Sequence, residues 1–200
     1  MYESMMMNKK SQLGRTLVEM LAVLSVLGAF TASVFTLIGN VTDKYKSSII
    51  LTQVREIRKA INSRYAALGI YTGLTTDILA KERLVSSNMI HNGKIYHAFK
   101  KEVSVAVGNT GGTGRSFFIN FIGLPAQNCV DLALIDWATD STAVLVGIRI
   151  NDKTFTWQEN EVDASGKFLT PADTALPLTL LKVSKACVSG ENNKITWEFQ

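Results

Sequence analysis

The run of residues from Leu17 to Ile38 contains a single ionisable side chain, the carboxyl group of Glu19. A run of this length suffices for one membrane-spanning helix, which needs about 20 residues. A carboxylate in such a run is costly, because an apolar environment disfavours the charged form unless a cation compensates it. We therefore predict that Glu19 acts by pairing with a positively charged group.

Two other patterns could indicate chemical sites but fail in detail. The glycine cluster from Gly108 to Gly114 could bind an anion, yet Arg115 and Ser116 follow it instead of the Lys-Ser/Thr pair of nucleotide-binding loops. Its flanks are typical of strands, so a surface hairpin is the better interpretation. The histidines His91 and His97 lack the i, i+4 helical spacing of zinc proteases. We interpret both as surface residues and predict no metal site.

Carboxylates and aromatic residues indicate no catalysis either. Asp131 and Asp136 are five positions apart, a spacing that does not bring two side chains together on one helical face. No Gly-x-Ser-x-Gly motif is present. Alternation along strands makes most of the later aromatic residues core rather than a platform for nucleic acid or glycan; these residues are Phe117, Phe118, Phe121, Trp137, Phe155, Trp157, Trp197 and Phe199. The sequence predicts no enzyme and no cofactor.

A short polar leader stands before the apolar run and ends in Gly14. It carries Lys9 and Lys10, and Glu19 is the fifth residue after Gly14. A secretory signal has the reverse order, because its cleavage site follows the apolar run and the apolar part is discarded. The region resembles the processing site of type IV prepilins, in which a prepilin peptidase removes the leader. The resemblance implies cleavage between Gly14 and Arg15.

The resemblance also implies three segments: a leader at 1–14, a hydrophobic transmembrane and assembly helix at 15–39, and an amphipathic helix half with a globular head at 40–200. In the family, the carboxylate that matches Glu19 pairs with the freed N-terminal amine of a neighbouring subunit. Arg15 departs from the family, which has Phe, Met or Leu after the glycine, and its guanidinium could compete for Glu19 within one chain. The alternative is an ordinary membrane anchor with Glu19 near the interface.

The charges of the chain are interspersed and nearly balanced. Lys and Arg number 21 against 17 Asp and Glu, and removal of Glu3, Lys9 and Lys10 with the leader leaves 19 against 16, a net charge of +3. The head contains no run of Lys and Arg that would indicate a nucleic-acid surface. Basic residues before the apolar run favour a cytoplasmic N-terminus, although Lys44 and Lys46 beyond it weaken the argument. We expect an inner-membrane precursor with a periplasmic or extracellular head.

Cys129 and Cys187 are the only cysteines of the chain. In an oxidising compartment they can form a disulfide, which would close a loop of nearly sixty residues and stabilise the head by about 4 kcal/mol. Two buried free thiols are the alternative. A metal site is not indicated, because no CxxC pair is present.

Beyond the apolar run, the pattern continues as an amphipathic helix. Apolar residues recur at spacings of three and four; they are Ile50, Val54, Ile57, Ile61, Tyr65 and Leu68. The residues between them, assigned to the polar face, are Arg55, Glu56, Arg58, Lys59 and Asn62. No proline precedes Pro125, so one helix can run from near Thr16 to Leu68, and Gly69 would end it in the left-handed conformation.

The sequence of the head predicts a mixture of strands and short helices. The pattern predicts a helix at about 76–85, capped by Thr75 or Thr76, and a second helix opened by Pro125 that carries Cys129. Strands are predicted at 103–107, 116–122, 144–150, 154–157 and 195–199. The segment LTLLKVSKACVSG is ambiguous between helix and strand.

Two runs of the head, FFINFIGLPAQNCVDLAL and KACVSGENNKITWEF, resemble the disulfide-bounded region of type IVb pilins. This resemblance favours a helix before Cys187 and a bond between Cys187 and Cys129. It implies an α+β fold in which a long N-terminal helix packs on an antiparallel sheet, with the C-terminal strand inside the sheet.

Two classes of function follow. The first is a structural subunit of a type IVb pilus, assembled with identical or related subunits into an extracellular filament for adhesion, aggregation or DNA transfer. The alternative is a minor pilin or a membrane-anchored binding module, such as a tip adhesin or a DNA receptor, whose ligand would be a host surface or DNA. Abundance in sheared filaments separates the two.

Overall fold

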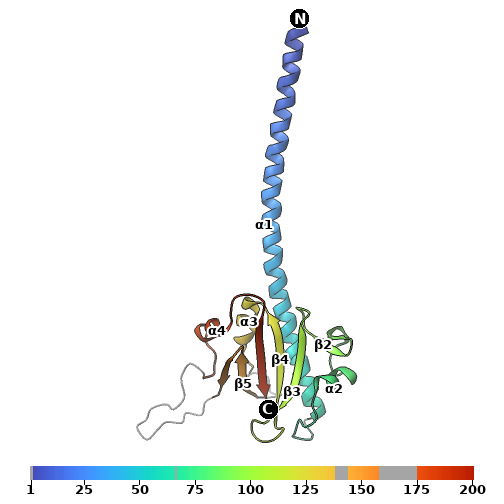
Figure 1. Ribbon diagram of the computed structural model, residues 1–200, viewed down its shortest axis with the longest axis vertical. Coiled ribbons are helices and arrows are strands. Elements are labelled where there is room, and N and C mark those ends of the chain that lie inside the picture. The colour runs from blue at the N-terminus through green and yellow to red at the C-terminus, as the bar shows by residue number, and fades with distance from the viewer. Residues whose placement is uncertain (1, 66, 138–143, 158–174) are drawn as a thin grey trace, which may run out of the picture. The chain divides into compact units, whose positions relative to one another are not determined.

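The computed structural model describes residues 2–65, 67–137, 144–157 and 175–200, with side chains described for 17–31, for 42 and, within those ranges, from 44 onward (Figure 1). The chain divides into two compact units, residues 1–44 and residues 45–200. The first is entirely helical where it is described, and the second contains the sheet.

The first helix, α1, covers Tyr2–Tyr65 and therefore begins before the predicted start near Thr16. It ends three residues before the predicted end, because the amides of Leu68 and Gly69 both donate to the carbonyl of Tyr65 (2.9 and 3.2 Å) and turn the chain. Gly69 has a φ of +62°, so the predicted left-handed glycine is confirmed. Leu68 is 66% exposed and does not join the buried face.

The second half of α1 packs on the sheet through the predicted apolar stripe. Ile50, Val54, Ile57 and Ile61 are fully buried, as the spacing of three and four requires. Arg58 contradicts its assignment to the polar face, because it is 1% exposed. Residue 58 lies one turn from 54 and 61, at the margin of the stripe, and its guanidinium carbon lies over aromatic rings of the head (Phe199, 5.2 Å; Trp137, 5.8 Å).

The sheet has seven strands in the order β1-β2-β3-β4-β7-β5-β6, and all neighbouring pairs are antiparallel. The strands are β1 (Ile90–His91), β2 (Lys94–Tyr96), β3 (Glu102–Gly108), β4 (Ser116–Leu124), β5 (Leu145–Ile150), β6 (Lys153–Thr156) and β7 (Asn193–Phe199). The C-terminal strand β7 lies between β4 and β5, which confirms the interior position that the resemblance implied (Figure 1).

The first two strands were not predicted from the sequence. They are joined by Asn92 and Gly93, which both have positive φ angles (49° and 74°), as a tight two-residue hairpin requires. The Asn-Gly pair is a strong hairpin signal, but its flanking runs are too short to show alternation.

Four short helices accompany the strands in the described parts of the head: α2 (Thr76–Lys81), the 3-10 helix η1 (Ser87–Met89), α3 (Ala126–Ala133) and α4 (Leu180–Ala186). The hydroxyl of Thr75 accepts from the amide of Ile78 (3.3 Å) and caps α2, as predicted. α2 ends earlier than expected, and Arg83 then takes a φ of +51°. The ambiguous segment before Cys187 forms the helix α4.

Alternation along the strands separates an apolar face from a polar one. Side chains that are fully buried on the apolar face include Phe117, Ile119, Phe121, Ile195, Trp197 and Phe199. Residues 45–65 of α1 cover this face (Figure 1). On the other face, hydrogen bonds join Asn120 to Ser104 and Thr196 to Asn120 across the strands (3.0 Å each).

Candidate assembly helix, disulfide region and apolar pocket

The residues predicted to be processed lie within α1. Gly14 and Arg15 are both helical, but their side chains lie outside the described ones, so their roles stay predictions. Glu19 follows one turn later and is exposed in the single chain. It is the only charged residue between Leu17 and Ile38. The helix therefore presents one carboxylate near the start of a long apolar surface.

That apolar surface has no buried side within the chain. Large side chains from 17 to 30 are all more than half exposed, from 55% to 72%: Leu17, Val18, Met20, Leu21, Val23, Leu24, Val26, Leu27 and Phe30. Successive helical residues are rotated by about 100°, so these positions point in all directions. Apolar surface on every side of a helix requires cover from outside the chain.

Among the residues whose side chains the structure describes, no helix has both the length and the apolar character that a membrane crossing requires. Residues 32–38, the last part of the predicted span, lie outside those side chains.

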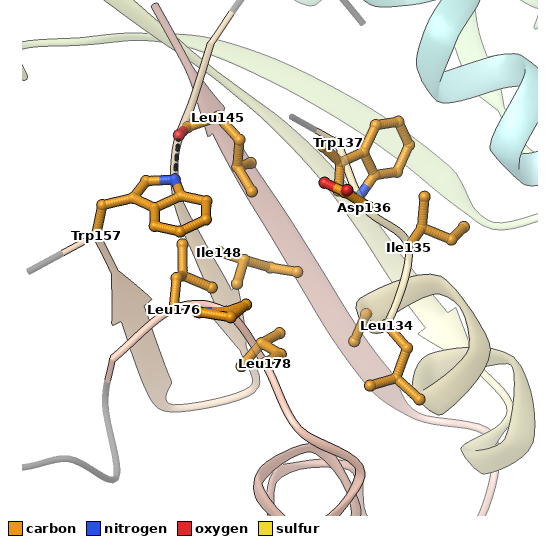
Figure 2. A pocket seen from close by; sticks show the side chains of 11 residues that line it. Leu134, Ile135, Asp136, Trp137, Leu145, Ile148, Trp157, Leu176 and Leu178 are labelled. Atoms are coloured by element: carbon orange, nitrogen blue, oxygen red, sulfur yellow. Dashed lines mark hydrogen bonds between the residues drawn. The ribbon is translucent and has the colours of Figure 1, made fainter. Parts of the chain in front are cut away.

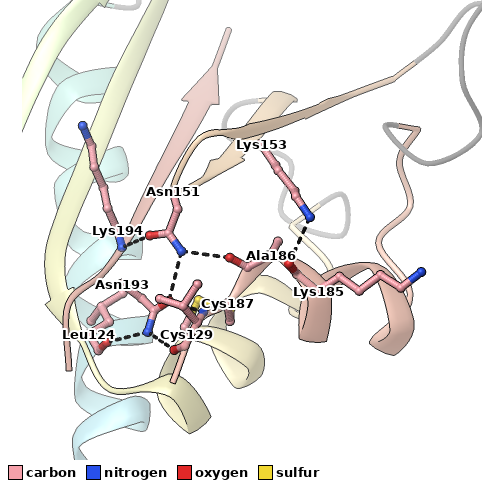
Figure 3. Close-up of a disulfide and its surroundings, with 10 residues drawn as sticks. Leu124, Cys129, Asn151, Lys153, Lys185, Ala186, Cys187, Asn193 and Lys194 are labelled. Atoms are coloured by element: carbon pink, nitrogen blue, oxygen red, sulfur yellow. Dashed lines mark hydrogen bonds between the residues drawn. A yellow bond between two sulfur atoms is a disulfide. The ribbon is translucent and has the colours of Figure 1, made fainter. Parts of the chain in front are cut away.

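The two cysteines are joined in a disulfide, as predicted (Figure 3). α3 provides Cys129, which is fully buried, and Cys187 follows the last residue of α4. The bond spans 58 positions of the chain and ties α3 to the segment that leads into β7. By the chain-entropy estimate such a loop closure contributes about 4 kcal/mol.

A buried amide fixes the backbone around this disulfide. Asn193 is 0% exposed, and its Oδ1 accepts from the amide of Val188 (2.7 Å) and from the Nδ2 of Asn151 (3.0 Å). Its Nδ2 donates to the carbonyls of Leu124 (3.2 Å) and Val188 (2.8 Å). All its hydrogen-bonding capacity is used, which makes a buried polar side chain tolerable. Sequence reasoning missed Asn193, because two of its partners, Asn151 and Leu124, lie far away in the chain.

A family model described as PilS N-terminal matches residues 44–200. The chain belongs to this family. It is also 27% identical over 197 residues to the major structural subunit of bundle-forming pilus of Escherichia coli O111:H-, and the match covers 97% of each chain. The same subunit of Escherichia coli O127:H6 gives the same identity and coverage. The resemblance to type IV pilins of the IVb type is confirmed.

Two solved structures are similar to this pilin. TcpA, a type IV pilin from Vibrio cholerae El Tor biotype, is 17% identical, with a TM-score of 0.48, and the match covers 78% of this chain and 98% of that one. The type IVb pilin from Salmonella typhi is 16% identical, with a TM-score of 0.46, and the match covers 73% and 96%.

His97 of this pilin corrects the prediction of surface histidines, since it is 3% exposed. Its ring stacks on Phe121 (5.2 Å between ring centres, 21° between planes). Nδ1 accepts from the amide of Phe99 (3.2 Å), and Nε2 donates to the carbonyl of Ile122 (2.8 Å). Burial lowers the pKa of His97, against the hydrogen bond to Ile122, and the charge of Lys101 lowers it further. His91 is exposed, as predicted.

The aromatic residues are mostly core, as predicted, but Phe118 is half-buried outside the core and Trp157 is exposed. Trp137 and Trp197 are at most 2% exposed, and their rings meet edge to face at 5.6 Å. Trp157 is 48% exposed and its Nε1 donates to the carbonyl of Leu145 (2.7 Å). This bond holds the indole beside β5 at the edge of the sheet (Figure 2).

Trp157 forms one wall of an apolar pocket of about 200 Å³, which sequence reasoning did not find. The other walls come from β5, from residues 133–137 at the end of α3 and just beyond it, and from residues 176–178 (Figure 2). The amide of Leu176 donates to the carbonyl of Thr156 (3.0 Å), and this hydrogen bond holds residues 176–178 beside β6. Asp136 is the one ionisable lining residue. The lining comes from three distant parts of the chain, so no local pattern reveals it.

Proposed function

We propose that this chain is a structural subunit of a type IVb pilus. The observation that carries the proposal is the match to major structural subunits of bundle-forming pili over 97% of both chains. The exposed apolar half of α1 supports it, because a filament core would provide the cover that the single chain lacks. Relatives that are major subunits favour this role over a minor pilin or an anchored binding module. Catalysis is not part of the proposal.

In this proposal a prepilin peptidase cuts between Gly14 and Arg15. The subunit is anchored in the inner membrane until it is assembled into an extracellular filament. Glu19 then pairs with the new N-terminal amine of a neighbouring copy. An unpaired carboxylate in an apolar core costs several kcal/mol, so this pairing would select the docking register. The guanidinium of Arg15 competes for the same carboxylate.

The change Glu19→Gln tests the pairing, because it removes the charge and keeps the shape. We expect the amount of subunit in sheared filaments to fall at least tenfold, while the Cys129–Cys187 disulfide forms as in wild type. Glu191→Gln is the matched control, since Glu191 is an exposed glutamate of the head, and it should leave filament levels unchanged. Intact-mass measurement of filament protein checks the cut after Gly14.

The outcomes separate the two parts of the proposal. Wild-type levels of Glu19→Gln subunits in filaments would refute the pairing but leave the structural role intact. Absence of the wild-type chain from sheared filaments would refute the structural role itself. Arg15→Phe should strengthen the pairing or leave it unchanged.

A further inference from the structure

Exposed lysines of the described head gather at one end of the sheet. At this end β3, β6 and β7 begin and β4 and β5 end, because neighbouring strands are antiparallel. The lysines in or next to these strand ends are exposed; they are Lys100, Lys101, Lys153 and Lys194. Lys185 of α4 is also exposed, and its backbone carbonyl accepts from Nζ of Lys153 (3.0 Å; Figure 3). We call these five side chains the lysine face.

The second half of α1 enters the head at the same end. The ammonium of Lys46 lies 4.9 Å from the ring centre of Phe99, in the turn that leads to β3. The side-chain amide of Asn128 in α3 donates to the hydroxyl of Ser47. Tyr45, the first residue of this unit, is 67% exposed. The lysine face therefore lies at the end of the head where the chain arrives from its apolar run.

Carboxylates do not balance the lysines at this end of the described head. Asp152 lies between β5 and β6 and Glu191 lies before β7, both exposed, and Asp131 of α3 is half-buried. The carboxylate of Glu102 already pairs with Lys94 (3.0 Å). The end keeps a net positive charge, and such a surface attracts anions.

We propose that the lysine face binds anionic phospholipid headgroups of the membrane that anchors the subunit before assembly. This rests on the proposed function, in which residues 15–39 form the anchor. Residue 45 follows that segment by six positions, about 9 Å along a helix such as α1. Charges act over about 10 Å at 0.1 M salt, so the end of the head near residue 45 lies within reach of the headgroups.

Two exposed side chains at this end favour a membrane over bulk solvent. Tyr45 carries the kind of ring that is enriched at the level of the headgroups. Val188 is 55% exposed, and its amide donates to Asn193 at the start of β7 (2.7 Å). Apolar atoms next to flexible lysines suit the boundary between headgroups and acyl chains. Each lysine near an anionic surface raises binding by about fivefold, so five together hold the head on the membrane.

Amine footprinting tests the contact on the full-length chain. The chain is placed in lipid nanodiscs with one copy per disc, so that no second subunit covers the lysines. Acetylation of the lysine face should be at least threefold slower in discs rich in phosphatidylglycerol than in discs of phosphatidylcholine alone. The difference should vanish at about 1 M salt, where charges act over only about 3 Å.

Lys59 provides the matched control within the same chain. It is exposed on α1 and follows Lys46 by 13 positions, about 20 Å along the helix. It should be acetylated at the same rate in both kinds of disc.

Charge reversal tests the face as a unit. Lys100→Glu with Lys194→Glu should at least halve the protection of the remaining three lysines. Lys59→Glu with Arg115→Glu makes the same change of charge away from the face, since Arg115 lies in the loop between β3 and β4 at the opposite end of the sheet. This pair should leave the protection unchanged. All four side chains are exposed, so both double variants should keep the disulfide and the unfolding temperature.

Equal acetylation of the lysine face in both kinds of disc would overturn this contact and leave the structural role standing. Protection in phosphatidylcholine alone, or protection that persists at high salt, would also overturn it, because something other than anionic headgroups would then cover the lysines. Failure of the full-length chain to enter the discs would overturn the membrane stage of the proposed function together with this contact.

Discussion

The two halves of α1 contain similar apolar residues, but those of the first half are exposed and a stripe of those in the second half is buried. From 17 to 30 they point in all directions and remain exposed, for example Met20 at 72% and Leu24 at 63%. From 50 to 61 one stripe is completely buried; it consists of Ile50, Val54, Ile57 and Ile61. Periodicity explains the difference, because only a stripe can be covered by a single sheet.

The comparison separates folding from assembly within one helix. Side chains of the second half contribute to the stability of the head, whereas those of the first half are available to partners outside the chain. Mutations in the two halves should therefore change different measurements.

The largest expected effect is the loss of a buried stripe residue. Ile57→Ala should lower the free energy of unfolding of the head by about 3 kcal/mol, because it leaves a cavity at a fully buried position. Leu24→Ala should change it by less than about 0.5 kcal/mol, since Leu24 is exposed. Tryptophan fluorescence during denaturant unfolding of the full-length chain measures both. Equal effects would contradict the division of the helix.

A smaller effect is expected from Arg58, which lies beside the stripe. Arg58→Ala should cost about 2 kcal/mol, because the guanidinium over Phe199 and Trp137 is lost together with the packing of its stem. Lys59→Ala removes an exposed neighbour and should cost less than about 0.5 kcal/mol. The same unfolding measurement compares the pair. Similar losses of unfolding free energy at both positions would contradict a stabilising role of the buried Arg58 side chain.

The smallest expected effect is a loss of stability at acidic pH through His97, which belongs to the side of the comparison formed by the second half of α1. The turn after His97 contacts this half, because the amide of Ala98 donates to Gln53 (3.2 Å) and the ammonium of Lys46 lies 4.9 Å from the ring of Phe99. A second proton would have to enter at Nδ1, which accepts from the amide of Phe99.

The sign follows from the lowered pKa of His97. The unfolded chain binds a proton near the ordinary pKa of about 6.5, while the folded chain resists it. Stability is therefore full above that pH and decreases as the pH falls toward the folded-state pKa. Thermal unfolding at about pH 7.5 and about pH 5.5 measures this. His97→Gln should reduce the difference and His91→Gln should preserve it; an unchanged difference in His97→Gln would assign it to other groups.

Several elements could be predicted because their causes are local. Alternation revealed the long strands, spacing of three and four revealed the buried stripe, and Thr75 marked the start of α2. The disulfide was predictable from the cysteine count and the expected compartment, and the resemblance placed both cysteines in one region. The hairpin of β1 and β2 was missed because strands of two and three residues carry no period.

The sequence by itself determined the helix, its one carboxylate in an apolar run and the alternating strands, since each depends on residues close together in the chain. Only the tertiary structure decided that Arg58 and His97 are buried, that Asn193 joins Asn151 and Leu124 beside the disulfide, and that three segments enclose a pocket. These features depend on residues far apart in the chain. The local sequence around an arginine or a histidine does not reveal which ring or carbonyl will contact it, because the burial of a polar group depends on the partners that folding brings to it.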